Sequence, residues 1–291
     1  MKKSQIFSNI VSDYDTNSIL QQEVGTRILK RLDFIQTSPN SILDAGCATG
    51  FFSRKLSKIF PKARVLGVDI STEMINFANK KKRWLSRQKF KVLDLTQIPI
   101  ENHKFDFIFC NLTLPWIEDI NHCFDQWKQQ LNPEGLLMFS TLGPDSFKEL
   151  KSELLRVDPD LPMMNFIDMH DIGDALLKNN FTDPVMDTEI LNFVYDNQPQ
   201  MIRELKSSGM LQLILGEKFH PLCQLLQYQQ ENSGKTNNDY LEIISPQNPE
   251  FSLTAEVIYG HAWGNDKLSM SEQKINNEKE QTYFIDASLK N

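Results

Sequence analysis

Residues 41–50 read Ser-Ile-Leu-Asp-Ala-Gly-Cys-Ala-Thr-Gly, an apolar run that ends on Asp44 and continues into a turn of small residues. The apolar run predicts a buried strand, and a helical pattern follows it at residues 51–60. Glycines between a strand and a helix N-terminus let a ligand approach the backbone closely and meet free N–H groups. This stretch therefore predicts a ligand-binding turn at the edge of a sheet.

Two further apolar runs also end on acids. Residues 64–69 end on Asp69 and residues 90–94 end on Asp94, so that successive acids are 25 residues apart. This spacing indicates repeated strand–helix units, which is typical of an α/β fold with a parallel sheet. Right-handed crossovers place the three acids at one sheet edge, where ligands of open α/β sheets bind. Any one acid alone is more simply explained as a loop residue or a helix cap, the role we expect of Ser71.

The rest of the chain extends this pattern and then departs from it. Up to residue 141 we expect helices at 16–33, 71–86 and 120–131, strands at 105–111 and 136–141, and a turn at 132–135. Beyond residue 142 we expect short helices at 145–157 and 169–179, a β-like segment at 184–195, a helix at 199–208 and a strand at 253–263. The resulting division is a single domain over 1–264, with an N-terminal helical cap (1–38), a cofactor core (39–142), a helical lid insertion (about 143–183) and C-terminal strands and helices (184–264). Residues 265–291 are expected to form a flexible tail.

Composition limits the function. The chain has 291 residues, 40% of them hydrophobic, with a net charge of −7, and sequence-independent nucleic-acid binding requires a basic surface instead. The four cysteines form no Cys-x-x-Cys pair and the five histidines have no metal-ligand spacing, which favours a reduced, metal-free, cytoplasmic protein. We also expect no membrane insertion, because no apolar stretch is long enough to span a bilayer.

The turn at Asp44 reads Asp-x-Gly-x-Ala-x-Gly and resembles that of class I S-adenosylmethionine-dependent methyltransferases. The resemblance implies a Rossmann-like, mostly parallel sheet with an antiparallel C-terminal strand and helices on both faces. It also implies S-adenosyl-L-methionine as the cofactor. The methionine part would be held by Asp44, Gly46, Ala48 and Gly50, the ribose by Asp69 beside Ile70, and the adenine by Asp94 beside Leu95, with Asn111 near the methyl group. Ala48 replaces the usual glycine, and its methyl group is tolerable where φ is negative.

Four later segments narrow the resemblance. Residues 166–174, 183–187, 205–209 and 256–263 are similar to the BioC family of malonyl-acyl-carrier-protein O-methyltransferases, over about residues 7–263. This implies that the chain methylates the free carboxylate of a malonyl thioester, on the carrier protein or on coenzyme A, at the start of biotin synthesis. Pro115-Trp116 departs from the usual family segment and predicts an altered pocket shape.

The implied reaction requires alignment rather than a base. A malonyl carboxylate is already ionised at neutral pH, and a cation would orient it. Arg203 and Lys206 share a helix face, and Arg203 is the first candidate. Further candidates are Lys148, Lys151 and Arg156, although each cation is otherwise an ordinary solvated charge. Tyr14 resembles an N-terminal tyrosine that closes over the cofactor in relatives, and its alternative role is that of a packing aromatic.

Two other functions remain open at this point. Residues 22–27 and 143–150 also resemble a mitochondrial respiratory complex I assembly factor that hydroxylates an arginine. The chain is alternatively a non-catalytic scaffold with a methyltransferase fold, for which Ala48 and Pro115 are the support. The basic run at residues 80–83 is expected to be a solubilising patch at the sheet edge opposite the cofactor.

Overall fold

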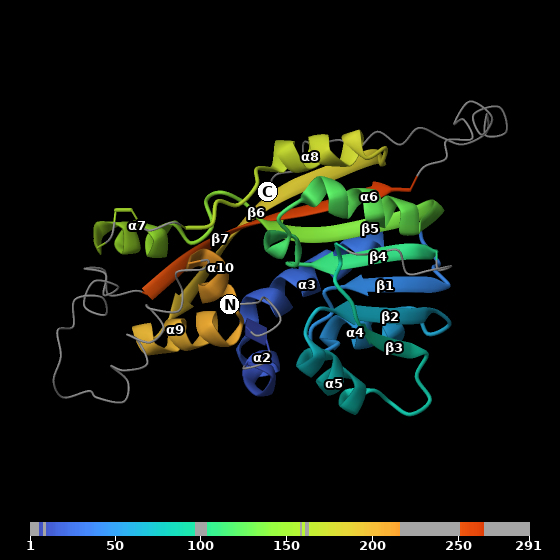
Figure 1. Ribbon diagram of the computed structural model, residues 1–291, viewed down its shortest axis with the longest axis horizontal. Coiled ribbons are helices and arrows are strands. Elements are labelled where there is room, and N and C mark those ends of the chain that lie inside the picture. The colour runs from blue at the N-terminus through green and yellow to red at the C-terminus, as the bar shows by residue number, and fades with distance from the viewer. Residues whose placement is uncertain are drawn as a thin grey trace, which may run out of the picture.

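The centre of the molecule is a seven-stranded sheet (Figure 1). The computed structural model describes residues 6–7, 10–96, 104–157, 159–160, 163–215 and 251–264. The strands are β1 (Ser41–Ala45), β2 (Arg64–Asp69), β3 (Gln88–Val92), β4 (Phe105–Asn111), β5 (Leu131–Leu142), β6 (Thr182–Tyr195) and β7 (Phe251–Trp263). They lie in the order β3-β2-β1-β4-β5-β7-β6. Strands β1 to β5 are parallel and β7 runs antiparallel to both of its neighbours, so the predicted fold class is confirmed.

Helices cover both faces of the sheet. One hydrophobic core joins the sheet to α3 (Ile19–Arg31) and α4 (Phe51–Ile59), and a second joins its other face to α6 (Ile120–Gln130) and α8 (Met169–Lys178). Strands β1 and β4 are neighbours although the chain passes through β2 and β3 between them. This is the topological switch point, outside which open α/β sheets bind their ligands.

Local signals in the sequence account for several helix starts. The Ser71 side chain accepts a hydrogen bond from the Met74 N–H and begins α5 (Thr72–Lys81), as predicted. Asp119 begins α6 in the same way, and Asn197 begins α9 (Gln198–Ser207). These side chains satisfy backbone N–H groups that have no partner within the helix.

The C-terminal part extends the sheet beyond its parallel strands. Figure 1 shows the long strands β6 and β7 reaching past β1 to β4, toward α7 (Lys148–Val157), α9 and α10 (Met210–Leu215). Helix α7 packs on β7, whereas α8 packs on α6 and β6. The two halves of the predicted lid insertion therefore lie in different places, and α8 is a sheet-covering helix.

Three predicted boundaries differ in the structure. The helix expected at 16–33 is interrupted at Ser18, which separates α2 (Val11–Asn17) from α3. Helix α5 ends at Lys81 because Lys82 has extended dihedral angles. The expected turn at 132–135 is an irregularity within β5, where the register to β4 shifts. The predicted tail at 265–291 lies outside the described residues.

Candidate active site

A cavity of about 410 Å³ lies at the carboxyl ends of β1 to β4. Its wall combines those strand ends with Phe7, Tyr14 and Gln21 of the N-terminal segment and with Ser208 and Met210. A smaller cavity of about 30 Å³ adjoins it around the glycine turn. Tyr14, Gln21, Gly46, Ala48 and Asn111 line both cavities. The larger volume is typical of a site for a small molecule or cofactor.

The turn after β1 is left-handed at three positions. The φ angles of Gly46, Ala48 and Gly50 are 78°, 45° and 73°. The condition under which a methyl group at Ala48 is easily tolerated, a negative φ, is therefore not met. Its left-handed conformation is held by a hydrogen bond from its N–H to Asp69 Oδ2 (2.9 Å), which offsets the strain of placing a Cβ there.

The two glycines of the turn serve different purposes. A Cβ on Gly46 would lie 2.1 Å from Thr113 Oγ1, at the cavity wall. A Cβ on Gly50 would lie 2.7 Å from the Phe90 ring. Gly50 begins α4 and lines neither cavity. Gly50 therefore does not contact the predicted cofactor site. It affects that site through the conformation of the turn.

Asp69 connects the turn to the end of β2. Its carboxylate accepts the Ala48 N–H and, through Oδ1, the N–H of Ser71 at 2.9 Å. The side chain is buried, and burial raises its pKa despite these backbone hydrogen bonds, which lower it. Asp69 and the adjacent Ile70 both line the larger cavity, where the sequence placed the ribose.

Asp44 lies deeper than Asp69. Its residue is 2% exposed, it accepts a hydrogen bond from the Ser53 hydroxyl, and it lines only the smaller cavity. Burial raises the pKa of Asp44 to about 7, and the nearby Asp69 adds to the rise, while Ser53 and Arg54 oppose it. The carboxyl group therefore responds to pH near neutrality, or to a cation beside it.

The far end of the larger cavity is built by Asp94 and its neighbours. Asp94 Oδ1 accepts the N–H of Thr96 at 2.9 Å and its hydroxyl at 2.8 Å. The carbonyl of Thr96 lies 2.9 Å from His122 Nε2. Asp94, Leu95, Thr96 and His122 all line the cavity, so the structure brings the predicted adenine-site residues Asp94 and Leu95 to the same cavity as Asp69.

Asn111 ties β4 to its neighbours rather than pointing freely into the cavity. Its Nδ2 donates to the backbone carbonyl of Gln21 (2.9 Å), and its Oδ1 accepts from the Ser140 hydroxyl (2.9 Å). The next residue, Leu112, has a positive φ of 50°, and its N–H donates to Ser140 Oγ (3.1 Å). Asn111 thus lines both cavities with its polar atoms already paired.

An aromatic pair closes one side of the cavity. The rings of Phe7 and Trp116 meet edge to face with centroids 4.9 Å apart. Pro115 lies in the short 3-10 helix Leu114–Trp116, which presents Trp116 to this contact. Gly209 packs closely here, since a Cβ on it would lie 3.2 Å from the Phe7 ring. Trp116 therefore forms part of the cavity wall, whereas Pro115 does not line the cavity.

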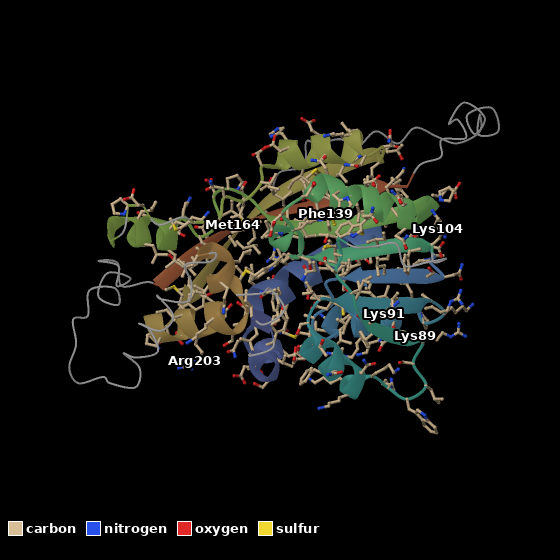
Figure 2. The ribbon with its side chains drawn as sticks, viewed as in Figure 1. Lys89, Lys91, Lys104, Phe139, Met164 and Arg203 are labelled. Atoms are coloured by element: carbon tan, nitrogen blue, oxygen red, sulfur yellow. The ribbon has the colours of Figure 1, made fainter. Side chains whose placement is uncertain are left out.

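Helix α2 is fastened over the glycine turn. Asp15 accepts a hydrogen bond from the Thr49 hydroxyl, and it forms ion pairs with Lys81 (2.9 Å) and Arg54 (3.8 Å). The expectation that residues 80–83 form a patch remote from the cofactor is wrong for Lys81. By contrast with Lys81, Lys89 and Lys104 lie toward the end of the strands that points away from α2 and α9 (Figure 2). The ion pairs hold Tyr14, the preceding residue, at the wall of both cavities.

The predicted substrate cations do not lie at the cavity. Among the described residues, neither a lysine nor an arginine lines it, and nor does any residue from 143 to 183. Arg203 is exposed on the outer side of α9 (Figure 2), Lys206 is half-buried there, and Lys148 is exposed on α7. Arg156 belongs to α7, but its side chain lies outside the described ones. The Nζ of Lys151 lies 4.6 Å from the centroid of the Phe166 ring.

Several residues at the cavity were missed by the sequence analysis. They are Phe7, Gln21, Thr113, Ile117, Glu118, Asp119, His122, Ser208 and Met210. Gln21 offered a usable signal, because it is a polar residue beside Leu20 and Val24 on the buried face of a helix. Thr113, Ile117, Glu118 and Asp119 lie in the loop directly after β4, whereas Phe7, Ser208 and Met210 come from distant segments.

The described part of the chain contains neither a metal site nor a membrane-spanning helix. No group of histidine, cysteine, aspartate and glutamate side chains there is arranged to hold a metal ion. None of the helices in the described ranges is long and apolar enough to cross a membrane.

The strand order, the cavity and the glycine turn define the class of protein. Residues 43–139 match the family model of the methyltransferase domain. The structure is similar to that of the YcgJ protein from Bacillus subtilis, with a TM-score of 0.56 at 14% identity, covering 84% of this chain and 99% of that one. The fold is that of class I S-adenosylmethionine-dependent methyltransferases.

Full-length relatives identify the family. The chain is 34% identical over 269 residues to the malonyl-[acyl-carrier protein] O-methyltransferase of Legionella pneumophila, covering 92% of each chain. It is 35% identical over 277 residues to malonyl-[acyl-carrier protein] O-methyltransferase 1 of Coxiella burnetii, covering 95% of this chain and 91% of that one. The chain therefore belongs to the malonyl-acyl-carrier-protein O-methyltransferase family.

Proposed function

We propose that this protein transfers a methyl group from S-adenosylmethionine to the free carboxylate of a malonyl thioester on an acyl carrier protein. The observation that carries the proposal is the similarity to enzymes of that name along nearly the whole chain, beyond the shared cofactor domain. The product would be the methyl ester that primes biotin synthesis. We further propose a reducing, cytoplasmic setting, in which Cys47, Cys110 and Cys123 remain the free thiols that the structure describes.

The cavity residues fit the groups of the cofactor. Bound S-adenosylmethionine carries a methyl group on a positively charged sulfur, and the carbon of this methyl group is the electrophile of the reaction. We propose that Asp69 accepts from the ribose hydroxyls and that Asp94 faces the adenine amine, since both line the larger cavity. Asp44 lies in the smaller cavity with Gly46 and Ala48, where its buried carboxylate suits the ammonium group of the methionine part.

The acceptor side requires positioning and exclusion of water. The malonyl carboxylate, with a pKa of about 3 to 4 by analogy with α-carboxyl groups, attacks without a base. In-line attack gains from holding the reactants at close distance and from removing water from the carboxylate. Phe7 and Trp116 supply an apolar wall for this purpose. We therefore propose that the N-terminal cap (1–38) closes the site, together with residues 208–210, in place of residues 143–183.

We propose Tyr14 as the donor that orients the carboxylate. Burial and the nearby carboxylates of Asp69 and Asp15 raise the pKa of Tyr14, so its phenol stays protonated and able to donate. Tyr14→Phe is then expected to raise the KM for the malonyl thioester, while Arg203→Ala leaves it unchanged. The opposite pattern would return the role to the cation on α9.

The decisive experiment is incubation of the protein with S-adenosylmethionine and malonyl-acyl-carrier protein, followed by mass spectrometry. One added methyl on the malonyl group is the expected result. Malonyl-coenzyme A in a parallel reaction identifies the preferred carrier, and an acetyl thioester, which lacks the free carboxylate, is the control. Cofactor binding without methyl transfer would favour the non-catalytic scaffold. A hydroxylated arginine on a protein substrate would instead favour the assembly-factor alternative.

A further inference from the structure

The loop between α5 and β3 carries an exposed apolar tip. The Ser86 N–H donates to the Arg83 carbonyl at 3.0 Å, which closes a turn with Trp84 and Leu85 as its two central residues. Trp84 is 94% exposed and Leu85 is 89% exposed. Turns favour glycine, proline, asparagine, aspartate and serine, so the geometry of the turn does not explain this pair. Two adjacent large apolar side chains held in water indicate a contact surface instead.

Cations flank the tip. Residues 54–91 contain twelve lysines and arginines but two acids, in a chain whose net charge is −7. Lys82 and Arg83 precede the apolar pair and Arg87 follows it; both arginines are exposed and Lys82 is half-buried. Arg87 Nη1 donates to the backbone carbonyl of Lys62 at 2.9 Å, which joins the exposed Lys62 to the same surface. We call residues 82–87 together with Lys62 the basic tip.

The basic tip lies at the edge of the sheet opposite the cavity. Residues 82–87 directly precede β3 and so lie at the amino ends of the parallel strands, whereas the cavity lies at their carboxyl ends. Figure 1 shows this loop projecting beyond the start of β3. The connection that precedes β1 reaches the same edge, because its Asn40 carbonyl accepts the Arg64 N–H at 2.8 Å. Phe34, in that connection, is 89% exposed as well. A partner at this edge leaves the cavity open.

We propose that the basic tip binds the surface of an anionic lipid bilayer. Trp84 and Leu85 form the end of the turn and the cations lie at its base, an order that matches the layers of such an interface. Tryptophan favours the level of the headgroups, and lysine and arginine are attracted to anionic headgroups. A projecting apolar tip enters a deformable lipid interface directly, whereas an acidic protein or a nucleic acid would have to supply a pocket for it. The contact is peripheral and takes no part in the proposed methyl transfer.

Protection of the sheet edge is the simpler role for some of these cations. Strand β3 is an outer strand of the sheet, and Lys89 and Lys91 on it are exposed. Lysines on an outer strand discourage pairing with another chain. This role accounts for Lys89 and Lys91, but it does not account for Trp84 and Leu85, which add apolar surface at the same edge.

Co-sedimentation of the full chain with vesicles tests the proposal. Vesicles made of equal parts phosphatidylcholine and phosphatidylglycerol are expected to bind the protein at least about ten-fold more tightly than phosphatidylcholine alone, and added salt should release it. The double variant Trp84→Ser, Leu85→Ser is expected to bind the mixed vesicles about ten-fold more weakly or worse. Tryptophan emission of the wild type should move to shorter wavelength on binding. Trp84→Phe keeps an apolar ring, so it should still bind but lose most of that shift.

Two matched controls remove equivalent groups elsewhere. Val194→Ser changes an apolar side chain that is 66% exposed on β6, and Lys148→Glu, on α7, is the counterpart of Arg83→Glu. Vesicle binding should fall in Arg83→Glu and stay unchanged in both controls. All of these side chains are exposed, so the melting temperature should also stay unchanged.

Three outcomes would overturn the proposal. The first is equal binding of the wild type to neutral and mixed vesicles, or binding to neither. The second is full vesicle binding by the double variant. The third is a different partner for the tip: binding of acyl carrier protein or DNA, or a dimer of this chain, that is lost in the double variant while vesicles are ignored. None of these outcomes bears on methyl transfer, which is measured without vesicles.

Discussion

Gly46 is the position in the ligand-binding turn where the structure predicts the largest penalty for an added methyl group. In Gly46→Ala, a φ of 78° would cost about 1 to 2 kcal/mol for a residue with a Cβ. The new atom would also lie 2.1, 2.5 and 2.8 Å from Thr113 Oγ1, Cγ2 and Cβ. Thr113 Cβ is fixed to the backbone and cannot rotate away, so overpacking adds about 1 to 3 kcal/mol. Alanine also makes the unfolded chain less flexible than glycine does, which offsets about 0.5 kcal/mol of this loss in stability.

The expected net loss is about 2 to 4 kcal/mol, or a fall in melting temperature on the order of 10 °C. Gly173→Ala makes the same chemical change within α8, where the Cβ would meet only Met186 Sδ at an ordinary 3.7 Å. That variant is expected to gain about 0.5 to 1 kcal/mol, because alanine is the better helix residue. Thermal and urea unfolding of both variants measures the difference.

Combining Gly46→Ala with Thr113→Ala separates backbone strain from steric overlap. The second change removes Oγ1 and Cγ2, and it is expected to recover about 1 kcal/mol or more as a coupling energy between the two sites. The reasoning is refuted if Gly46→Ala is as stable as the wild type, or if the two substitutions are simply additive.

Two further predictions concern the charged groups around the same turn. Asp15→Asn removes the ion pairs to Lys81 and Arg54, and it should lower the free energy of unfolding by about 1 kcal/mol or less. It should also weaken cofactor binding, most clearly at low salt. Asp13→Asn, in the same helix, should change neither stability nor binding. Burial raises the pKa of Asp44 from 3.8 to about 7, so the native state binds its proton more tightly than the unfolded state does. Stability of the ligand-free protein should therefore fall as the pH rises from about 4 to about 7. Urea unfolding across that range should show a shallower fall in Asp44→Asn, and an unchanged slope would contradict the assignment.

The sheet edge could be predicted because local sequence specifies it. Apolar runs that end on acids identify strands, and right-handed connections then bring the strand ends together. Gly46, Asp69 and Asp94 accordingly line the cavity. The conformation of Ala48 could not be predicted in this way. An alanine prefers negative φ, but here the geometry of the turn and the bond to Asp69 outweigh that preference.

The acceptor side depends on contacts that no local pattern reveals. On α9 the buried residues are Met201, Glu204 and Leu205, which turns Arg203 outward to solvent. A similarity between segments identifies the helix but not the face that it presents to the cavity. The bond from Gln21 to Ser208 spans 187 positions in the chain, and it brings residues 208–210 to the site. The closing segment proposed above, which is not the one expected from the sequence, rests on such long-range contacts.

The two strained residues at the cavity reveal how the site is organised before a ligand arrives. Ala48 and Leu112 both have left-handed φ angles, and they follow β1 and β4, the strands on either side of the switch point. Each N–H donates to a side chain on a neighbouring strand, Ala48 to Asp69 and Leu112 to Ser140. A strain of about 1 to 2 kcal/mol per residue is comparable to the gain from such hydrogen bonds. The backbone is thereby fixed around the cavity in advance, so binding has little of it left to order.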